Sequence, residues 1–318
     1  GEQVAARSTP VGTTLSRMQP SSVNSGETNT NSWCAIPADN FQVRMGPNYR
    51  KNKLKGPSLP AFYEPANVDV FFSPEEKSDH IMQHISQAGL PRVEGVGNVP
   101  GLLVVNLQVP SYIPTFFGQA AKDGDGWSVV LYFQLKSQTR QRLLAHSPDQ
   151  SGQAHTEEDN ALVLLKRFFD ACETGSRTDY STLARLKAIP LVVNADDLQV
   201  AMPTRKVLAT YNAKPFMTGP RCHTFYRRSS YVEVDVNIHD FCFLAKKGIS
   251  AFLDDVKDIV VDLGFVIQGN DNDEMPEQLL GCVRLSKIQA HNAGTMASAS
   301  RAAGSSASRN GSPPRKTP

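Results

Sequence analysis

Two groups of basic residues alternate with aromatic residues, a pattern suited to binding an anion. The first group falls within twelve residues and consists of Arg44, Arg50, Lys51, Lys53 and Lys55. The second lies in RCHTFYRR (residues 221–228) and ends in Arg227 and Arg228. Pro47 and Pro57 restrict the backbone around the first group, so its charges should be held in place. Each basic residue near anionic lipid contributes about 1 kcal/mol; the alternative is an ordinary solvated surface.

Motifs for metal binding and for catalysis are incomplete in this chain. His80 and His84 have the four-residue spacing of ligands on a helix, but the sequence HIMQH lacks the glutamate of the HExxH motif. The acidic stretch 269–277 lacks the glycine and the spacing of an EF-hand, which predicts a solvated loop. No GxSxG, GxGxxG or GxxxxGK[ST] motif occurs. We therefore predict neither a metal ion nor a cofactor.

Glu233 and Asp235 are the carboxylates with the clearest structural setting. They lie in SYVEVDVNI (residues 230–238), where polar residues alternate strictly with valine and isoleucine. This alternation predicts a half-buried antiparallel strand with its valines inward and its carboxylates toward solvent. If the two carboxylates instead faced a cavity, they could serve an enzyme of unknown type. That alternative stays open.

The elements that position these residues follow from the hydrophobic pattern. Two predicted strands at 101–113 and 127–136 could pair antiparallel, and two more lie within 259–288. A helix is predicted for 160–173, where apolar residues share one face. The mixture favours an α+β fold with a mainly antiparallel sheet, packed with several helices in a single domain. Two smaller lobes divided in the polar loop 146–159 are the alternative.

A capping pattern marks one more predicted helix. Ser73 is a suitable N-cap, Glu76 stands at the third helical position, and Gly89 provides the stop. Such a helix would carry His80 and His84 on one face.

Composition places the chain among globular proteins. It has 318 residues, of which 40% are hydrophobic and 20% charged, and its net charge of +2 argues against a dedicated nucleic-acid binder. Five cysteines without a CxxC pair indicate reduced thiols. No apolar run is long enough to form a transmembrane helix. We therefore expect a cytoplasmic protein that could be peripheral on membranes.

The two ends of the chain differ from its middle. Residues 1–30 and 291–318 are rich in small and polar residues with few large apolar ones. Such segments cannot bury enough apolar surface to offset the entropy of ordering. The sequence predicts a disordered N-terminal linker at 1–30, a folded domain at 31–290 and a disordered C-terminal tail at 291–318.

Five segments of the predicted domain form an ordered set: FQVRMGPNYRKNKLKGPS, VVNLQVP, YVEVDVNI, VVDLGFVIQG and MPEQLLGCVRL. In this order they resemble the C-terminal domain of the plant enhanced disease resistance 2 family, which also occurs in algae and protists. One departure is Met45, which separates Arg44 from Gly46, whereas plant members place Gly directly after the matching Arg.

The resemblance implies a setting linked to lipids. Plant members carry an upstream phosphoinositide-binding pleckstrin-homology domain and a START lipid-transfer domain, neither of which lies within this chain. No catalytic residues follow from the resemblance. We expect a non-enzymatic regulatory module of a lipid-linked, membrane-peripheral protein that binds anionic lipid or a protein partner, and no nucleic acid.

Overall fold

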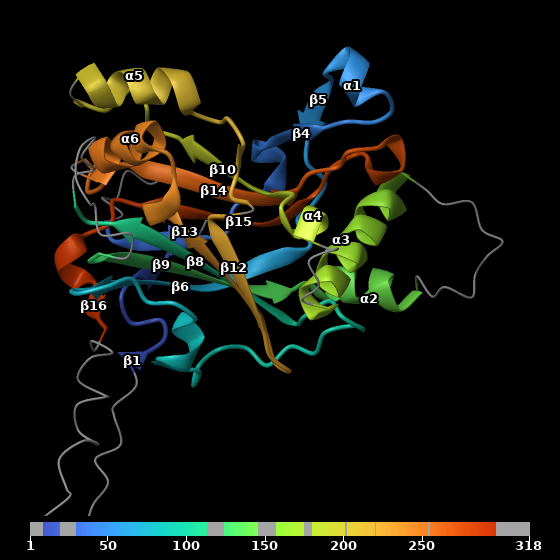
Figure 1. Ribbon diagram of the computed structural model, residues 1–318, viewed down its shortest axis with the longest axis horizontal. Helices are drawn as coiled ribbons and strands as arrows, with labels where there is room; N and C mark the ends of the chain where they lie inside the picture. The colour runs from blue at the N-terminus through green and yellow to red at the C-terminus, as the bar shows by residue number, and fades with distance from the viewer. Residues whose placement is uncertain are drawn as a thin grey trace, which may run out of the picture.

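Two six-stranded sheets stacked face to face form the centre of the molecule (Figure 1). The computed structural model describes residues 9–19, 30–112, 124–145, 157–174, 180–200, 202–219, 221–253 and 255–296. The first sheet contains, in order, β11 (Phe216–Met217), β10 (Leu186–Val192), β14 (Val260–Ile267), β15 (Leu279–Ser286), β3 (Ser32–Cys34) and β2 (Ser16–Arg17). The second contains β12 (His223–Arg227), β13 (Val232–Asn237), β8 (Leu102–Pro110), β9 (Gly126–Leu135), β6 (Tyr63–Ser73) and β16 (Gly294–Thr295).

Helices and two small strand pairs complete the described fold. The strand pairs are β1 (Thr9–Pro10) with β7 (Ile85–Ser86), and β4 (Gln42–Arg44) with β5 (Lys55–Pro57). The helices are α1 (Tyr49–Asn52), α2 (Ser137–Ala145), α3 (Glu157–Thr174), α4 (Tyr180–Leu183), α5 (Met202–Tyr211) and α6 (Phe243–Leu253). Among the described helices, none is both long and apolar enough to cross a bilayer.

Most neighbouring strands run antiparallel, which confirms the predicted α+β class. The predicted pair β8 and β9 is antiparallel, with Val105 opposite Leu131, and β14 and β15 form the predicted C-terminal pair. Parallel pairs also occur, among them β13 with β8 and β16 with β6.

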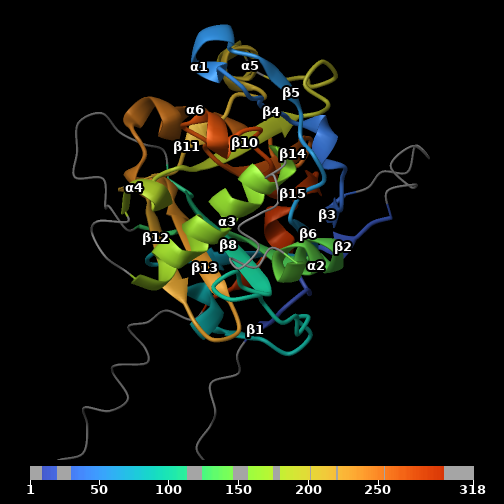
Figure 2. The same cartoon turned by 90° about the vertical axis from the view of Figure 1, so that its right-hand side faces the viewer.

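The main core lies between the two sheets and continues under α3. Phe133 of β9 meets Phe265 of β14 edge to face, with ring centroids 6.1 Å apart. Gly281 of β15 leaves room for this stack, because a Cβ there would lie 2.7 Å from the Phe133 ring. Helix α3 lies across one end of both sheets (Figure 2). Its predicted apolar face is confirmed, since Phe168 and Phe169 are fully buried there.

The second sheet is covered on its other face as well, and this corrects the prediction for residues 230–238. A second apolar cluster there includes Val11 and Met82, packed with Val104 and Tyr132 of the sheet. Strand β13 has its valines in the main core and pairs antiparallel with β12, as predicted. It is buried on both faces rather than half-buried, and its other neighbour, β8, runs parallel to it.

The helix predicted after Ser73 does not form. Strand β6 continues to Ser73, and the chain then passes through turns into a short 3-10 helix at Ile81–Gln83. His80 adopts a left-handed conformation with a φ of 47°. The backbone N–H groups that a helix would need are instead donated to buried carboxyls of β13. These tertiary contacts outweigh the local capping pattern.

The predicted disorder of the two ends is corrected where the structure describes them. Residues 9–19 pack on β6, where the carboxylate of Asp69 accepts backbone N–H bonds from Gly12, Thr13 and Thr14. At the other end, β16 pairs with β6 through residues 294–295. The predictions for 1–8, 20–29 and 297–318 fall outside the described residues.

Candidate functional site

The first basic group lies on a hairpin that stands out from the sheets at the top of Figure 1. Strands β4 and β5 pair antiparallel, and α1 bridges them. Asn48 and Lys53 flank α1 in left-handed conformations, with φ values of 66° and 55°. The Asn52 side chain closes the turn by donating to Pro47 O at 3.1 Å and accepting from Leu54 N at 2.9 Å. The segment whose backbone the prolines were expected to restrict is thus a hydrogen-bonded hairpin that fixes the positions of its charges.

A buried carboxylate, Glu277, attaches the hairpin to the first sheet. It accepts from the backbone N of Arg44 at 3.2 Å, and the Arg44 guanidinium lies 3.7 Å away. It also accepts from Lys187 Nζ of β10 at 2.9 Å and from Gly269 N at 3.1 Å. One carboxylate therefore ties together β4, β10 and the segment after β14.

The same carboxylate only partly balances the positive charge around it. Burial lowers the pKa of Lys187, and the charges of Arg44 and Lys55 lower it further, while Glu277 opposes the shift. Arg44 also lies over the Tyr49 ring, with 4.9 Å to the ring centroid. The hairpin base is therefore a region of net positive potential held in fixed geometry.

The segment opposite the hairpin is braced by a second buried carboxylate, Glu274. It pairs with Arg167 of α3 at 2.7 Å and with Arg185 at 2.9 Å, and it accepts from Asn270 N at 2.7 Å. Burial raises the pKa of Glu274, but the Asn270 N–H and the Arg185 guanidinium outweigh burial and leave it lowered. The prediction of a solvated loop at 269–277 is thus wrong for its second half, which is buried.

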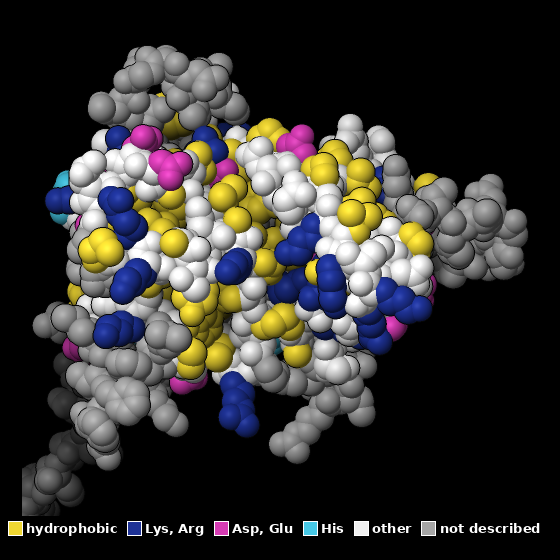
Figure 3. Space-filling model, turned by 90° about the horizontal axis from the view of Figure 1, so that it is seen from above, with side chains coloured by type: hydrophobic (Ala, Val, Ile, Leu, Met, Phe, Trp, Pro, Cys, Tyr) yellow, Lys and Arg dark blue, Asp and Glu magenta, His cyan; other side chains and the backbone are white. Residues whose placement is uncertain are grey.

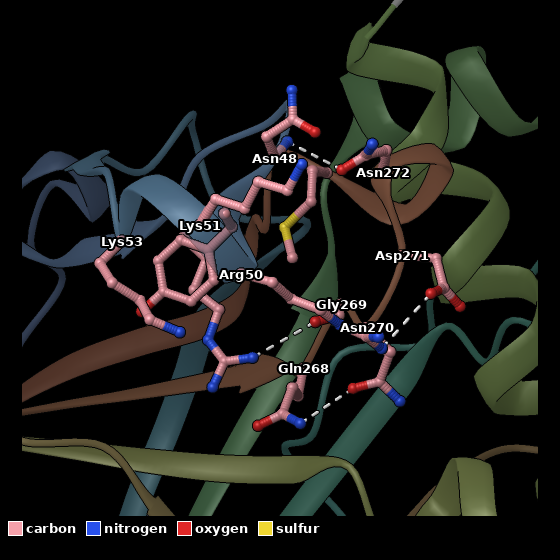
Figure 4. Close-up of a pocket in the computed structure, with 12 residues that line it drawn as sticks. Asn48, Arg50, Lys51, Lys53, Gln268, Gly269, Asn270, Asp271 and Asn272 are labelled. Atoms are coloured by element: carbon pink, nitrogen blue, oxygen red, sulfur yellow. Dashed lines mark hydrogen bonds and ion pairs between the residues drawn. The ribbon is translucent and has the colours of Figure 1, made fainter.

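Between the hairpin and this segment lies a hollow of about 430 Å³, here called the hairpin cleft (Figure 4). It is lined by Arg44, Asn48, Tyr49, Arg50, Lys51, Lys53, Gln268, Gly269, Asn270, Asp271, Asn272 and Met275. Asn48 N donates to Asn272 Oδ1 at 2.8 Å across one end of the cleft. A second hollow of about 240 Å³ adjoins it at Arg44, Tyr49 and Gln268, and extends to Lys55 and Lys187.

The exposed lysines of the hairpin keep their charge available. Within the described part of the chain, neither Lys51 nor Lys55 has a carboxylate at ion-pair distance, and Lys53 rests over the Tyr49 ring at 5.7 Å. Arg50 makes a loose pair with Asp271 at 3.5 Å, with both side chains exposed. Such exposed pairs are worth at most about 1 kcal/mol, so a stronger anion could displace Asp271.

The second basic group does not join the cleft. Arg227 ends β12 and donates to Asn98 O at 3.0 Å and to Phe169 O at 3.5 Å, which fixes backbone around α3. Arg228 is exposed and lines a separate hollow of about 860 Å³ with residues 87–102. The sequence suggested one function for both groups, but the fold separates them.

The carboxyl pair Glu233 and Asp235 is buried rather than exposed, with 0% and 2% of their surfaces accessible. Ile81 N donates to Glu233 Oε1 at 2.7 Å, and His80 N donates to Asp235 Oδ2 at 2.8 Å. His80 Nε2 also lies 3.8 Å from Glu233 Oε2. Carboxyls beside a histidine are an acid–base set, but here the carboxyl oxygens hold the backbone of 80–82. Through these contacts the two carboxyls fix the segment 80–82 against β13.

The pair retains a proton at neutral pH. Burial, and then the neighbouring Asp235 carboxyl, raise the pKa of Glu233 to about 9. Burial also raises the pKa of Asp235, although the Glu233 side chain and the His80 N–H oppose the shift. Glu233 is therefore protonated at neutral pH, and the two carboxyls titrate as a pair.

The two histidines whose spacing suggested a metal site, His80 and His84, lie in different environments. His80 is buried and stacks on Tyr226 with centroids 4.2 Å apart, whereas His84 is exposed. Over the described ranges, no group of three or more His, Cys, Asp or Glu side chains could hold a metal ion. All five cysteines are free.

Sequence reasoning missed the residues that organise the cleft. Lys187 lies in an apolar strand, and Glu274 and Glu277 lie in a stretch that resembled a solvated loop. One sequence feature could have pointed to Glu277. It lies in MPEQLLGCVRL, one of the five segments on which the family resemblance rests.

Comparisons with known proteins agree with that resemblance. The family model described as "Protein ENHANCED DISEASE RESISTANCE 2, C-terminal" matches residues 33–289. The "Protein ENHANCED DISEASE RESISTANCE 2-like" of Arabidopsis thaliana is 26% identical over 266 residues, covering 83% of this chain and 29% of that protein. The chain thus spans less than a third of this relative's length. No solved structure matches.

Proposed function

This chain belongs to the family of the enhanced disease resistance 2 C-terminal domain, and we propose that it is a non-enzymatic module that binds an anionic lipid headgroup in the hairpin cleft. In this role it would act as a regulatory part of a membrane-peripheral protein.

The observation that carries the proposal is the convergence of basic residues on one preformed site. Six basic side chains and only two carboxylates line the two adjoining hollows. The basic residues are Arg44, Arg50, Lys51, Lys53, Lys55 and Lys187. The whole chain has a net charge of only +2, so this excess is local. A local excess attracts a compact anion, whereas a nucleic acid would need a longer basic surface.

The chemistry of the lining suits a phosphorylated headgroup. Arg44 and Lys51 provide charged donors, and Asn48, Gln268 and Asn270 provide neutral amide groups at the same hollow. Charge-assisted hydrogen bonds to phosphate are stronger than neutral ones. The volume of about 430 Å³ falls in the range of small-ligand sites.

The preformed hairpin reduces the entropy lost on binding. Its turn is closed by the Asn52 side chain, and its base is held by Glu277. A flexible loop would have to order its charges when the ligand arrives, and that ordering weakens binding.

A matched pair of double variants tests the proposal. Lys51→Ala with Lys55→Ala removes two exposed charges beside the cleft, and Arg92→Ala with Arg228→Ala removes two exposed charges beside the distant hollow. The assay is co-sedimentation with phosphatidylcholine vesicles containing a phosphatidylinositol phosphate, run beside a thermal melt.

The first variant should lose about 2 kcal/mol of vesicle affinity, or about 30-fold, at about 1 kcal/mol per basic residue. The control should bind like the unchanged protein, and both should melt normally. Binding should weaken with salt as the screening length falls to about 8 Å. Equal binding by a well-folded Lys51/Lys55 variant would reject the proposal.

A further inference from the structure

Large apolar side chains are exposed on the elements around the hairpin cleft. Leu54 is 53% exposed and stands between two lysines at the end of the hairpin. Met217 of β11 is 44% exposed and lines the second hollow together with Lys55. Tyr211, at the end of α5, is half exposed, and Met202 at its start is more so. A single exposed apolar residue needs no explanation, but a group on one face does.

These side chains lie on one side of the molecule. Helix α5 and the β4–α1–β5 hairpin both stand above the sheets in Figures 1 and 2. The short chain from Tyr211 leads from α5 to β11, whose Met217 lines the second hollow. Figure 3 looks onto this side and shows apolar side chains interspersed with Lys and Arg. The exposed Lys206 and Lys214 belong to the same region.

We infer that this face docks on the surface of an anionic bilayer, with a headgroup in the hairpin cleft and with Leu54 and Tyr211 at the boundary between headgroups and acyl chains. This inference rests on the proposed function and specifies the surface that presents the headgroup.

The mixture of residue types favours a bilayer over a protein surface. Lysine is depleted at the cores of protein interfaces, whereas Lys53 and Lys55 flank Leu54 directly in the sequence. At a bilayer the same mixture is favourable, because lysine stems can lie along apolar groups while their ammonium groups reach phosphates. Tyrosine is enriched at the level of the headgroups, which suits the exposed Tyr211.

Leu54 and Leu144 provide a matched pair for the test. They are 53% and 55% exposed, but Leu144 lies on α2, well below the hairpin in Figures 1 and 2. Leu54→Trp and Leu144→Trp each add one tryptophan to a background in which Trp33 is buried and Trp127 is largely covered. Fluorescence is measured as the difference from the unchanged protein, with phosphatidylinositol phosphate vesicles made from ordinary or brominated phosphatidylcholine.

On these vesicles the added tryptophan of Leu54→Trp should shift its emission to the blue and should be quenched by the brominated acyl chains. Leu144→Trp should show neither effect. In a second arm, the uncharged variant Leu54→Ser should lower vesicle affinity at least tenfold while its affinity for soluble inositol phosphate stays unchanged, and Leu144→Ser should leave both affinities unchanged.

The possible failures are distinct. Vesicle binding without quenching at position 54, or full vesicle binding by Leu54→Ser, would overturn the bilayer inference, while headgroup binding in the cleft would stand. Absence of binding to both vesicles and soluble inositol phosphate would overturn the inference and the proposed function together.

Discussion

The stability of this domain should fall as the pH rises from neutral toward about 9, because Glu233 keeps a proton in the folded state. Its side chain is fully buried, and burial followed by Asp235 raises its pKa from 4.5 to about 9. Between these two values the folded protein binds a proton that the unfolded chain releases. The stabilisation is fully present below the unfolded pKa of 4.5 and is lost as the pH rises through the folded pKa.

The magnitude follows from proton linkage. A difference of one bound proton changes the free energy of unfolding by about 1.4 kcal/mol per pH unit. The folded protein itself releases half of this proton by pH 9, so the mean slope between pH 7 and pH 9 is about 1 kcal/mol per unit. The pKa values of His80 and His223 are lowered by burial, which gives the opposite slope, but only below about pH 6.5. Above pH 7 the histidines no longer contribute, but burial also raises the pKa values of four cysteines, Cys34, Cys172, Cys222 and Cys282. Their effect is common to the unchanged protein and to a Glu233 variant, so the difference between the two isolates Glu233.

Urea denaturation of the unchanged protein and of Glu233→Gln, from about pH 7 to pH 9, measures the effect. At pH 7 the glutamine variant should be less stable by about 1–2 kcal/mol, because one of the two backbone N–H groups loses its acceptor. Its stability should fall less steeply with pH, by about 1 kcal/mol per unit. Glu64→Gln, an exposed site on β6, is the control and should track the unchanged protein. Parallel pH profiles for the unchanged protein and Glu233→Gln would refute a protonated Glu233.

Three further outcomes are expected. Glu277→Ala leaves Lys187 buried without its partner and should destabilise the domain by about 3–5 kcal/mol in urea; Asp271→Ala, which removes only an exposed pair, should cost less than about 1 kcal/mol. Asp69→Ala removes the acceptor of three backbone N–H groups, so limited proteolysis should cut within 9–19 faster than in the unchanged protein. Elemental analysis of the purified chain should find no stoichiometric zinc or calcium. One metal ion per chain would refute the prediction, made from the incomplete motifs, that the chain binds no metal.

The local sequence pattern predicted an element correctly where the residues that it marks as apolar are also the ones that the fold buries. Helix α3 was predicted from the helical spacing of its apolar face, and strands β8 and β9 from apolar runs next to turn residues. The prediction of a helix after Ser73 failed although the capping pattern was adequate. The backbone N–H groups there bond to buried carboxyls that lie more than 150 residues later in the chain. The sequence prediction failed again at β13, because its second face is covered by the irregular segment around residues 80–82, which no periodicity reveals.

The candidate site was predictable in part for a similar reason. Its exposed charges are adjacent in sequence, so the first basic group could be identified as a unit. Its supports are not adjacent, since Glu277 is 233 positions from Arg44 and 90 from Lys187. Residue types alone did not separate the basic group that builds a cleft from Arg227, whose guanidinium bonds to backbone carbonyls.

The arrangement around Glu277 also has a consequence for ligand binding. This carboxylate can balance about one of the two charges of Arg44 and Lys187, and Lys51 and Lys55 have no carboxylate partner within the described chain. The basic side chains that line the two hollows therefore repel one another, which costs stability. An anion that binds the folded state removes this repulsion and adds its own binding energy, so it should raise the melting temperature. Soluble inositol phosphate should thus stabilise the unchanged protein, and should stabilise Lys51→Ala with Lys55→Ala much less, since in that variant both the repulsion and the attraction are reduced.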